Sequence, residues 1–423
     1  MKRQQQHQRR RPDAPRSNDG GLGTGSIVEV EIERIVPGGA GLAHAEGYTL
    51  FVTLVAPGDR VRVCVDRVRG KVAFASVLEV ITPSPVRVEA PCPYFGRCGG
   101  CDFQQLTYEA QLEAKAEIIR DCLRRIARVE LPATIQITPS PDIWRYRSRA
   151  RWQHDPVRQY LGYYELASHR VCDVVECPVV LREVQTKLSH LRATLGAGAF
   201  EETEEFQAVA GDDGVSLLPP LEEADTREQI RVIAGEHYRF DAACFFQINH
   251  ALLEPLLKEA LKAATGAGAA IDLFCGVGLF TLPLARRFAR VTGVEGNAAA
   301  TAFARLNLAD AQLANASVET ARVGDWLARH AGSLSPIDFL LLDPPRAGAD
   351  PEVIAGILTL RPGRIAYVSC DPATLARDLR ALLDGGFTLD SITAFDMFPQ
   401  THHVETVAHL TRTDLSGTLV DMI

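Results

Sequence analysis

From residue 241 onward, short apolar strands alternate with helical segments, and this alternation constrains the fold more than any other feature. Four of these segments are typical of buried strands: AAIDLF, RVTGVE, IDFLLLD and RIAYVS. Strands that are apolar on both faces and joined through helices form a parallel sheet with helices on both sides. We therefore predict a doubly wound, Rossmann-like α/β domain over 241–423, with reactive groups at the carboxyl ends of its strands.

The chain is too long for that domain alone, because 423 residues should form two or three hydrophobic cores. Residues 25–85 alternate apolar and polar side chains between Gly-rich and Pro-rich turns, which predicts a small OB-like β-barrel. Residues 86–240 hold a cysteine cluster, a helical pattern over 106–127 and irregular strands. We expect them to form an α+β central domain.

Residues 1–20 carry six Lys or Arg against two Asp and almost no apolar side chains. Such a segment cannot bury enough apolar surface to offset its ordering entropy, so we expect a disordered basic tail over 1–24. The tail is either a solvated terminus or a tether for a polyanion. The whole chain has a net charge of −8, which does not by itself favour binding to nucleic acid.

Other bulk features bear on the compartment. No apolar run approaches the roughly 20 residues of a membrane-spanning helix, and no apolar segment of a secretory signal follows the basic N-terminus. Ten cysteines in a chain that is not exported indicate metal binding or catalysis rather than a disulfide framework. We expect a monomeric cytoplasmic protein without membrane contact.

Three cysteines lie close together in the central region. Cys92, Cys98 and Cys101 form a C-x5-C-x2-C motif with two glycines in the last gap. Glycine allows the tight turn that lets two thiolates converge on one metal. A fourth ligand must come from a distant segment, and Cys177 and Cys172 are the candidates. Four thiolates suit a [4Fe–4S] cluster or a tetrahedral zinc ion equally well.

The first strand of the α/β domain is followed by a nucleotide-binding type of turn. The strand ends at Phe274, and Gly276 and Gly278 let the chain turn closely against a ligand. Glu295 ends the next strand about 20 residues later, where an acid accepts hydrogen bonds from a ribose. Because the third glycine of the dinucleotide motif is missing, a nucleoside without a pyrophosphate fits best, such as S-adenosylmethionine.

Two further reactive side chains end strands of the same domain. Asp343 follows IDFLLL and precedes two prolines; it could hold a planar substrate edge-on or cap a helix. Cys370 follows RIAYVS. A free cysteine is often a small core residue, but the end of a parallel strand is also where chemistry is done.

Together these motifs resemble those of the RNA uracil-5-methyltransferases of the RumA/TrmA family. The matching segments are FFQIN, DLFCGVGLFTLPLA, GVEGN, LLLDPPRAG, YVSCDPATLARDL and MFPQTHHVETVAHLTR. They follow the family's order and spacing, and the resemblance covers nearly the whole chain after residue 25. The N-terminal strands are similar to a TRAM domain. The cysteine set, with Cys177 as its fourth member, is similar to the family's [4Fe–4S] site, which favours iron–sulfur over zinc.

The resemblance implies that Cys370 is a nucleophile and Glu405 a base, with His402 and His403 as alternative bases. Addition of a thiolate to C6 of uracil makes C5 nucleophilic enough to take a methyl group. A base must then remove the C5 proton so that the enzyme is released. The target base must leave its stack to reach the thiol.

The resemblance also assigns the contacts to S-adenosylmethionine. They are Gln247, Phe274, Glu295 and Asp343. Two positions depart from the family. Leu279 stands where some ribosomal members have asparagine, and Asp371 stands where SCNP is common. The added carboxylate of Asp371 would by itself raise the pKa of Cys370. The resemblance further implies that the helix over 106–127 packs on the catalytic domain.

The expected function is methylation of C5 of a uridine in RNA, in 23S ribosomal RNA, because the transfer-RNA branch typically lacks the TRAM-like barrel and the cysteine cluster. Transfer-RNA methylation is the alternative within this class. A non-catalytic iron–sulfur protein that binds or folds RNA would need neither Cys370 nor Glu405. An iron–sulfur redox enzyme would need a second cofactor motif.

RNA recognition is expected from the barrel, the central domain and the tail. In the barrel, VDRVRGK places Arg67, Arg69 and Lys71 close together, as a phosphate-binding ribbon or a solvated edge. In the central domain, WRYRSRARW (144–152) interleaves arginines with aromatic side chains, a pattern that suits stacked single-stranded bases. The alternative for 144–152 is an ordinary strand with one charged face.

Overall fold

The computed structural model describes residues 21–130, 135–196, 204–222, 225, 228–334 and 336–416. Residues 1–20 of the expected tail lie outside these ranges. Leu22, within the expected tail 1–24, is buried in the core of the N-terminal sheet. No helix within these ranges has the length and apolar character needed to cross a membrane.

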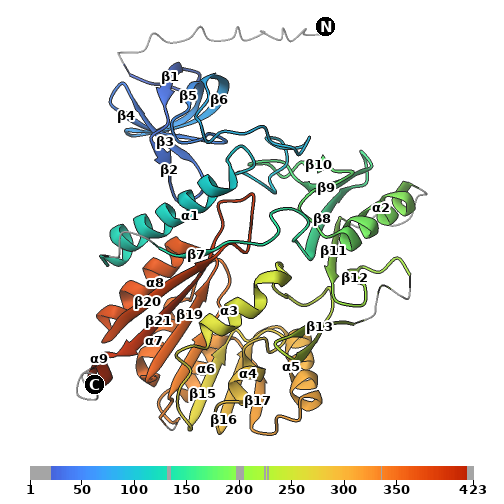
Figure 1. The fold of residues 1–423 in the computed structure, drawn as a ribbon, viewed down its shortest axis with the longest axis vertical. Coiled ribbons are helices and arrows are strands. Elements are labelled where there is room, and N and C mark those ends of the chain that lie inside the picture. Colours follow the sequence, from blue (N-terminus) through green and yellow to red (C-terminus); the bar gives the residue numbers. More distant parts are fainter. Residues whose placement is uncertain are drawn as a thin grey trace, which may run out of the picture.

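The N-terminal region forms a six-stranded sheet, at the top of Figure 1. Its order is β1-β5-β6-β4-β3-β2, and its strands are β1 (Ile27–Glu31), β2 (Arg34–Ile35), β3 (Gly41–Ala45), β4 (Tyr48–Val52), β5 (Arg60–Arg69) and β6 (Val72–Thr82). The apolar alternation explains this arrangement: Val61, Val63 and Val65 of β5 all face the core. Pairing of β1 with β2, which would close the sheet, is not among the described strand pairs, so the closed barrel stays a prediction.

The central region forms an antiparallel sheet of five strands, with α2 (Arg182–Gly196) packed against β11 and β12. Its order is β10-β9-β8-β11-β12, and its strands are β8 (Arg149–Asp155), β9 (Tyr160–Tyr164), β10 (Val171–Asp173), β11 (Glu205–Ala210) and β12 (Val215–Leu218). A separate hairpin, β13 (Gln229–Ile233) and β14 (Glu236–Phe240), leads to the last region. Trp152 and Phe206 are fully buried in the core between sheet and helix.

The C-terminal region has an eight-stranded sheet of order β17-β16-β15-β18-β19-β21-β20-β7. The parallel strands are β15 (Ala269–Leu273), β16 (Arg290–Glu295), β17 (Ala316–Thr320), β18 (Phe339–Leu342) and β19 (Arg364–Ser369). Antiparallel β21 (Glu405–Arg412) joins β19 to β20 (Phe387–Phe395), and β7 (Ile137–Thr138) pairs with β20 at the edge. The predicted doubly wound sheet is present.

Helices cover both faces of this sheet. Side chains of β18 alternate between two cores, with Leu340 and Leu342 in one and Phe339 and Leu341 in the other. The first core contains α6 (Val323–His330), α7 (Pro351–Leu360) and α8 (Pro372–Asp384). The second contains α3 (Leu253–Ala260), after the 3-10 turn η3 (His250–Leu252), together with α4 (Thr281–Ala285) and α5 (Ala298–Asp310). A short α9 (Thr413–Ser416) follows β21.

Helix α1 (Tyr108–Cys122) leaves its neighbours in sequence and lies between the N-terminal sheet and the C-terminal region (Figure 1). Thr107 caps it by accepting a hydrogen bond from the backbone N–H of Ala110. Its apolar face, continued by the π turn η1 (Leu123–Ala127), joins the core around α8, where Ile118 and Ile119 are buried. The segment between the cysteine cluster and α1 is therefore held against the C-terminal sheet.

Candidate active site and four-thiol cavity

Three predicted reactive side chains meet at one edge of the C-terminal sheet. Cys370 follows parallel β19, and Asp343 follows its neighbour β18. Glu405 begins antiparallel β21, whose Thr406 pairs with Ser369, so Glu405 and Cys370 both lie just beyond the last pair of these two strands. The carboxyl end of β19 and the amino end of β21 thus bring a thiol and a carboxyl group together.

The thiol of Cys370 is half-buried, and its surroundings are mostly acidic. Burial raises the pKa of Cys370 to about 12, and the charges of Glu405 and Asp343 contribute to this rise. Arg346, exposed on the loop after β18, lowers this pKa. The cation of Arg346 is therefore the nearby group that favours a thiolate at this position.

Glu405 is 1% exposed, and its Oε1 has no hydrogen-bond partner among the described residues. Burial, followed by the charge of Asp343, raises the pKa of Glu405 well above its usual range, whereas Arg346 lowers it. A carboxyl group kept dry in this way is a stronger base than one in water.

The alternative bases differ from Glu405. Burial and neighbouring positive groups lower the pKa of His403 to about 2, so its imidazole holds a proton poorly. His402 has its Nδ1 engaged by the carboxylate of Asp102. His402 is also 25% exposed, unlike the buried Glu405.

Gln247 and Asp343 form a pair beside this thiol and carboxyl group. Gln247 Nε2 donates a hydrogen bond of 3.1 Å to Asp343 Oδ2. Burial raises the pKa of Asp343 to about 7, and the amide of Gln247 lowers it. The structure therefore brings both residues to the edge that holds Cys370 and Glu405.

Phe274 and Glu295 lie at the ends of the adjacent strands β15 and β16. Phe274 has a left-handed φ of 61°, which reverses the chain at the strand end. Glu295 accepts hydrogen bonds from the backbone N–H groups of Gly276, at 3.1 Å, and Asn297, at 2.7 Å. The carboxylate thus fixes the predicted glycine turn from the neighbouring strand.

Sequence reasoning missed Asp272, which precedes this turn. Asp272 is fully buried, and Thr281 donates to its Oδ2 at 2.5 Å. Burial raises the pKa of Asp272 to about 8. An acidic residue inside the otherwise apolar strand AAIDLF was the available signal.

The two departures from the family have local explanations. The side chain of Leu279 is buried in the apolar core around α3, α4 and α5. Asp371 is the N-cap of α8, because its Oδ1 accepts from the backbone N–H groups of Ala373, at 3.0 Å, and Thr374, at 2.8 Å. Asp and Asn cap helices equally well. The effect of Asp371 on the pKa of Cys370 has the predicted sign but follows burial, Glu405 and Asp343 in size.

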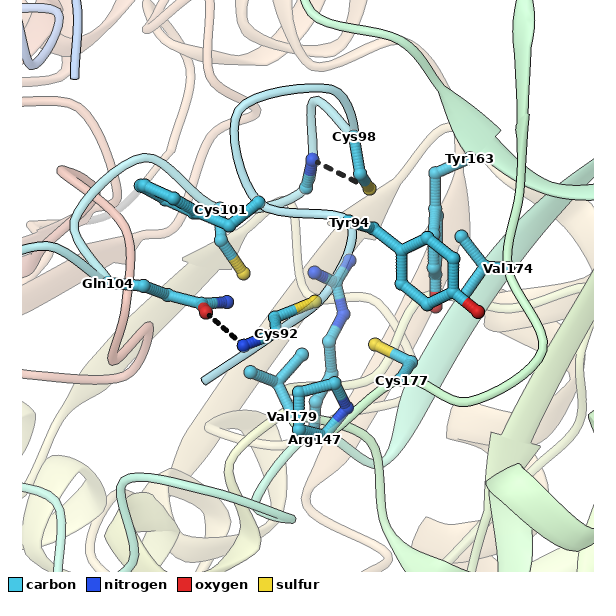
Figure 2. A pocket seen from close by; sticks show the side chains of 13 residues that line it. Cys92, Tyr94, Cys98, Cys101, Gln104, Arg147, Tyr163, Val174, Cys177 and Val179 are labelled. Atoms are coloured by element: carbon cyan, nitrogen blue, oxygen red, sulfur yellow. Dashed lines mark hydrogen bonds between the residues drawn. The ribbon is translucent and has the colours of Figure 1, made fainter. Parts of the chain in front are cut away.

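Four of the predicted thiols line one cavity in the central region, as Figure 2 shows: Cys92, Cys98, Cys101 and Cys177. Burial raises the pKa of Cys98 and of Cys101 to about 12. Cys172, the rival fourth member, lines a different pocket, where Arg97 Nε donates to its Sγ at 3.2 Å. Among the described residues, no three Cys, His, Asp or Glu side chains converge closely enough to hold a single metal ion.

Polar groups hold the walls of this cavity. Gln104 Oε1 accepts a hydrogen bond of 3.3 Å from Cys92 N, and Gln185 Oε1 accepts one of 2.9 Å from Cys177 N. Arg147 also lines the cavity and points between the thiols in Figure 2. The segments that carry Cys92 and Cys177 are thereby fixed around the cavity, and the cation of Arg147 lies beside it.

The expectation that 144–152 presents arginines and aromatic rings to RNA stays a prediction, and the structure leaves only part of the stretch exposed. Trp152 is fully buried, and Arg149 donates to the carbonyl of Ala242 at 3.0 Å and to Gln207 Oε1 at 2.7 Å. Arg147 lines the thiol cavity. The stretch ends in β8, an internal strand of the sheet, whose Arg149 binds neighbouring segments, whereas Arg151 is exposed and pairs with Glu205 at 2.6 Å.

The cationic hairpin of the N-terminal sheet lies where it was expected, on β5 and β6. The guanidinium of Arg67 stacks on Phe74, with 4.3 Å from Cζ to the ring centre. Lys71 Nζ lies 4.4 Å from the ring centre of Tyr48. These cation–π contacts hold positive charge at the tip of the N-terminal sheet.

Comparisons with known proteins agree with this architecture. The sequence matches the family described as tRNA (Uracil-5-)-methyltransferase over residues 221–328 and 332–413, and the TRAM domain over residues 23–78. It is 34% identical over 420 residues to the 23S rRNA (uracil(1939)-C(5))-methyltransferase RlmD of Pectobacterium atrosepticum, covering 90% of this chain and 93% of that protein. An uncharacterized RNA methyltransferase of Halalkalibacterium halodurans is 33% identical over 450 residues, covering 91% and 96%.

A solved structure matches over almost the same length. It is the tRNA (uracil-54, C5)-methyltransferase of Pyrococcus abyssi in complex with S-adenosyl-L-homocysteine. The TM-score is 0.69 at 26% identity, and the match covers 90% of this chain and 100% of that one.

Proposed function

The chain belongs to the tRNA (uracil-5-)-methyltransferase family and is an RNA uracil-5-methyltransferase, and from this premise we propose that it methylates a uridine of 23S ribosomal RNA through a covalent bond from Cys370 to C6. Relatives named as 23S ribosomal RNA methyltransferases, such as those of Pectobacterium atrosepticum and Methylococcus capsulatus, support the ribosomal substrate. The observation that carries the mechanism is that Cys370 and Glu405 lie together at one edge of the sheet, just beyond the Ser369–Thr406 pair.

Cys370 is the proposed nucleophile. Its Sγ bonds to C6 of the uracil, the electrons of the C5–C6 double bond move toward O4, and the thiol proton leaves to solvent at the half-exposed side chain. The positive charge of Arg346 favours the thiolate that this step needs. When bound, S-adenosylmethionine supplies the electrophilic methyl group.

Glu405 is the proposed base. After methyl transfer, its carboxylate takes the C5 proton, the C5–C6 double bond re-forms, and the bond from C6 to Sγ breaks. Burial raises the pKa of Glu405, which makes its carboxylate a stronger proton acceptor. The lowered pKa of His403 argues against that residue as the base.

The proposed cofactor contacts remain those assigned from the sequence: Gln247, Phe274, Glu295 and Asp343. Their support is position, because all four lie at the carboxyl edge of the sheet or are hydrogen-bonded to a residue there. This is the edge at which open α/β sheets bind ligands. The carboxylate of Glu295 lies beside the Gly276 turn. There it would accept a hydrogen bond from a ribose hydroxyl.

A [4Fe–4S] cluster is proposed for the four-thiol cavity, with Cys92, Cys98, Cys101 and Cys177 as ligands. Its support is that all four thiols line one cavity, because four thiolates are the ligand set of such a cluster. The resemblance of the cysteine set to the family's site favours the cluster over zinc, which four thiolates would also suit. Arg147 offsets part of the negative charge that four thiolates would bring.

Transfer RNA is the second candidate substrate, favoured by the structural match to the Pyrococcus abyssi enzyme. The experiment is to map 5-methyluridine in ribosomal and transfer RNA from cells with and without this protein. We expect one ribosomal position to lose its methyl group and transfer RNA to stay unchanged. Loss confined to transfer RNA would contradict the ribosomal assignment.

A further inference from the structure

The loop at 398–403 leads into Glu405 and is held by residues of α1 and of the segment just before it. Backbone N–H groups of Asp102 and Phe103 donate to the carbonyl of Gln400 at 3.1 and 3.0 Å. Lys115 Nζ donates to the carbonyl of Phe398 at 3.1 Å. This loop, called here the base loop, is therefore attached to a part of the chain almost 300 residues earlier.

Gln400 is the centre of this attachment. It has a left-handed φ of 70°, a conformation that a non-glycine residue keeps only when its surroundings enforce it. Gln111 enforces it: its Oε1 accepts from Gln400 N at 2.9 Å, and its Nε2 donates to Gln400 Oε1 at 3.0 Å. Both glutamines are at most 2% exposed.

Of these contacts to the base loop, that of Asp102 lies nearest in sequence to Glu405. Its Oδ1 accepts a hydrogen bond of 2.9 Å from His402 N, and its Oδ2 is paired with His402 Nδ1. One carboxylate thus fixes both the backbone and the ring of His402. The His402 ring lies 4.1 Å from the ring of His403 between centres, and the charge of Arg346 acts on His403. The base loop therefore connects Asp102, through His402 and His403, to the active-site edge.

The N-terminal sheet meets the same point. Gly39, in the turn between β2 and β3, has a left-handed φ of 81°. A Cβ atom on Gly39 would lie 2.8 Å from Asp102 Oδ2 and 3.0 Å from His402 Cβ. Gly38 has a similar φ of 89°, but a Cβ atom there would meet nothing within 4 Å. The absence of a side chain at Gly39 is what allows this close approach.

We propose that Asp102 is a positioning residue for the elimination step, because it fixes the base loop through His402 and thereby sets the position of Glu405. This inference rests on the proposed role of Glu405 as the base. Glu405 itself pairs with Phe395 of β20, and β19 joins the pairing from Thr406 onward, whereas the chain just before Glu405 follows the base loop. A base displaced by about 1 Å can lose on the order of 100-fold in rate.

The first test compares Asp102→Ala with Asp102→Asn. Asparagine still accepts from His402 N and can donate to Nδ1, so it should restore most of the activity that alanine loses. For Asp102→Ala we expect kcat to fall about 10- to 100-fold, KM for RNA to change less than about twofold, and methylated RNA to accumulate as a covalent adduct with the protein. Unchanged kcat and adduct level in Asp102→Ala, or equal losses in both variants, would overturn the proposal.

The second test uses the glycines as a matched pair. Gly39→Ala and Gly38→Ala introduce the same backbone cost, but only the first places a methyl group against Asp102 and His402. We expect adduct accumulation in Gly39→Ala alone. The same phenotype in both variants would contradict the proposed contact.

Hydrogen exchange separates this inference from the proposed chemistry. Asp102→Ala should speed exchange at the amides of Gln400 and His402 in RNA-free protein, whatever residue is the base. Unaltered exchange there would overturn the positioning role. If Glu405→Gln turned over normally while exchange still increased in Asp102→Ala, the assignment of the base would fail and the hold of Asp102 on the loop would stand.

Discussion

The two thiol sites of this protein are alike in burial and different in what surrounds them. Burial raises the pKa of Cys370 to about 12, as it does for Cys98 and Cys101 in the four-thiol cavity. Burial alone therefore does not make a cysteine a nucleophile or a ligand. Cys370 lies alone at a strand end beside a carboxyl group and near Arg346, which suits covalent chemistry. The other thiols face one another, which suits a shared metal group.

The largest effect should come from removing one thiol of the cavity. Cys177→Ala, purified anaerobically, should lose its iron and sulfide, because a cluster needs all four ligands. Cys172→Ala is the matched control and should keep both, since Cys172 lines another pocket. Iron, sulfide and zinc analysis checks this. Zinc in place of iron and sulfide in the unaltered protein would refute the cluster. Loss of metal only in Cys172→Ala would show that Cys172, not Cys177, is the fourth ligand.

A smaller effect should follow from breaking the ion pair that joins α1 to the C-terminal region. Lys115 of α1 and Asp396 are both fully buried and paired with each other. Lys115→Ala leaves the Asp396 carboxylate buried without its partner, which should cost about 3–5 kcal/mol of unfolding free energy. Replacing both residues, as Lys115→Met with Asp396→Leu, should recover most of the loss. Denaturant titration measures the free energy of unfolding of both variants. An equal loss in the two would show that packing around Lys115, and not the unpaired charge, causes the destabilisation.

The smallest effect concerns the cation beside Cys370. Arg346 lowers the pKa of Cys370, so Arg346→Ala should raise that pKa and move the ascending limb of the kcat/KM profile to higher pH. The rate near pH 7 should fall about tenfold and recover as the pH rises. Arg346→Lys keeps the charge and should show a smaller displacement. A uniform loss of rate at every pH would indicate that Arg346 binds substrate instead.

Sequence patterns predicted the active-site edge because strand order in a parallel sheet follows simple rules. Asp343 and Cys370 each end an apolar strand, and parallel strands place such ends together. The pattern could not fix the role of 144–152, because alternation does not say which face is covered. Trp152 faces a core formed by α2, which lies later in the sequence.

Contacts between distant segments could not be predicted from the sequence for a different reason. Asp102 and His402 are 300 residues apart, and no sequence motif pairs them. Their pairing depends on how α1 packs against α8 and on the missing side chain at Gly39. Asp371 is a similar case. The sequence shows only a charge beside Cys370, whereas the structure shows that Asp371 caps helix α8.

The measurement that tests the central claim most directly is a denaturing gel of protein incubated with RNA and methyl-labelled S-adenosylmethionine. Glu405→Gln keeps the thiol but lacks a carboxylate to take the C5 proton, so elimination should stall and a labelled protein–RNA band should accumulate. Cys370→Ala should give neither band nor methylated RNA, while Cys64→Ala, in the N-terminal sheet, should behave like the unaltered protein. A labelled band in Cys370→Ala, or normal turnover in Glu405→Gln, would contradict the account.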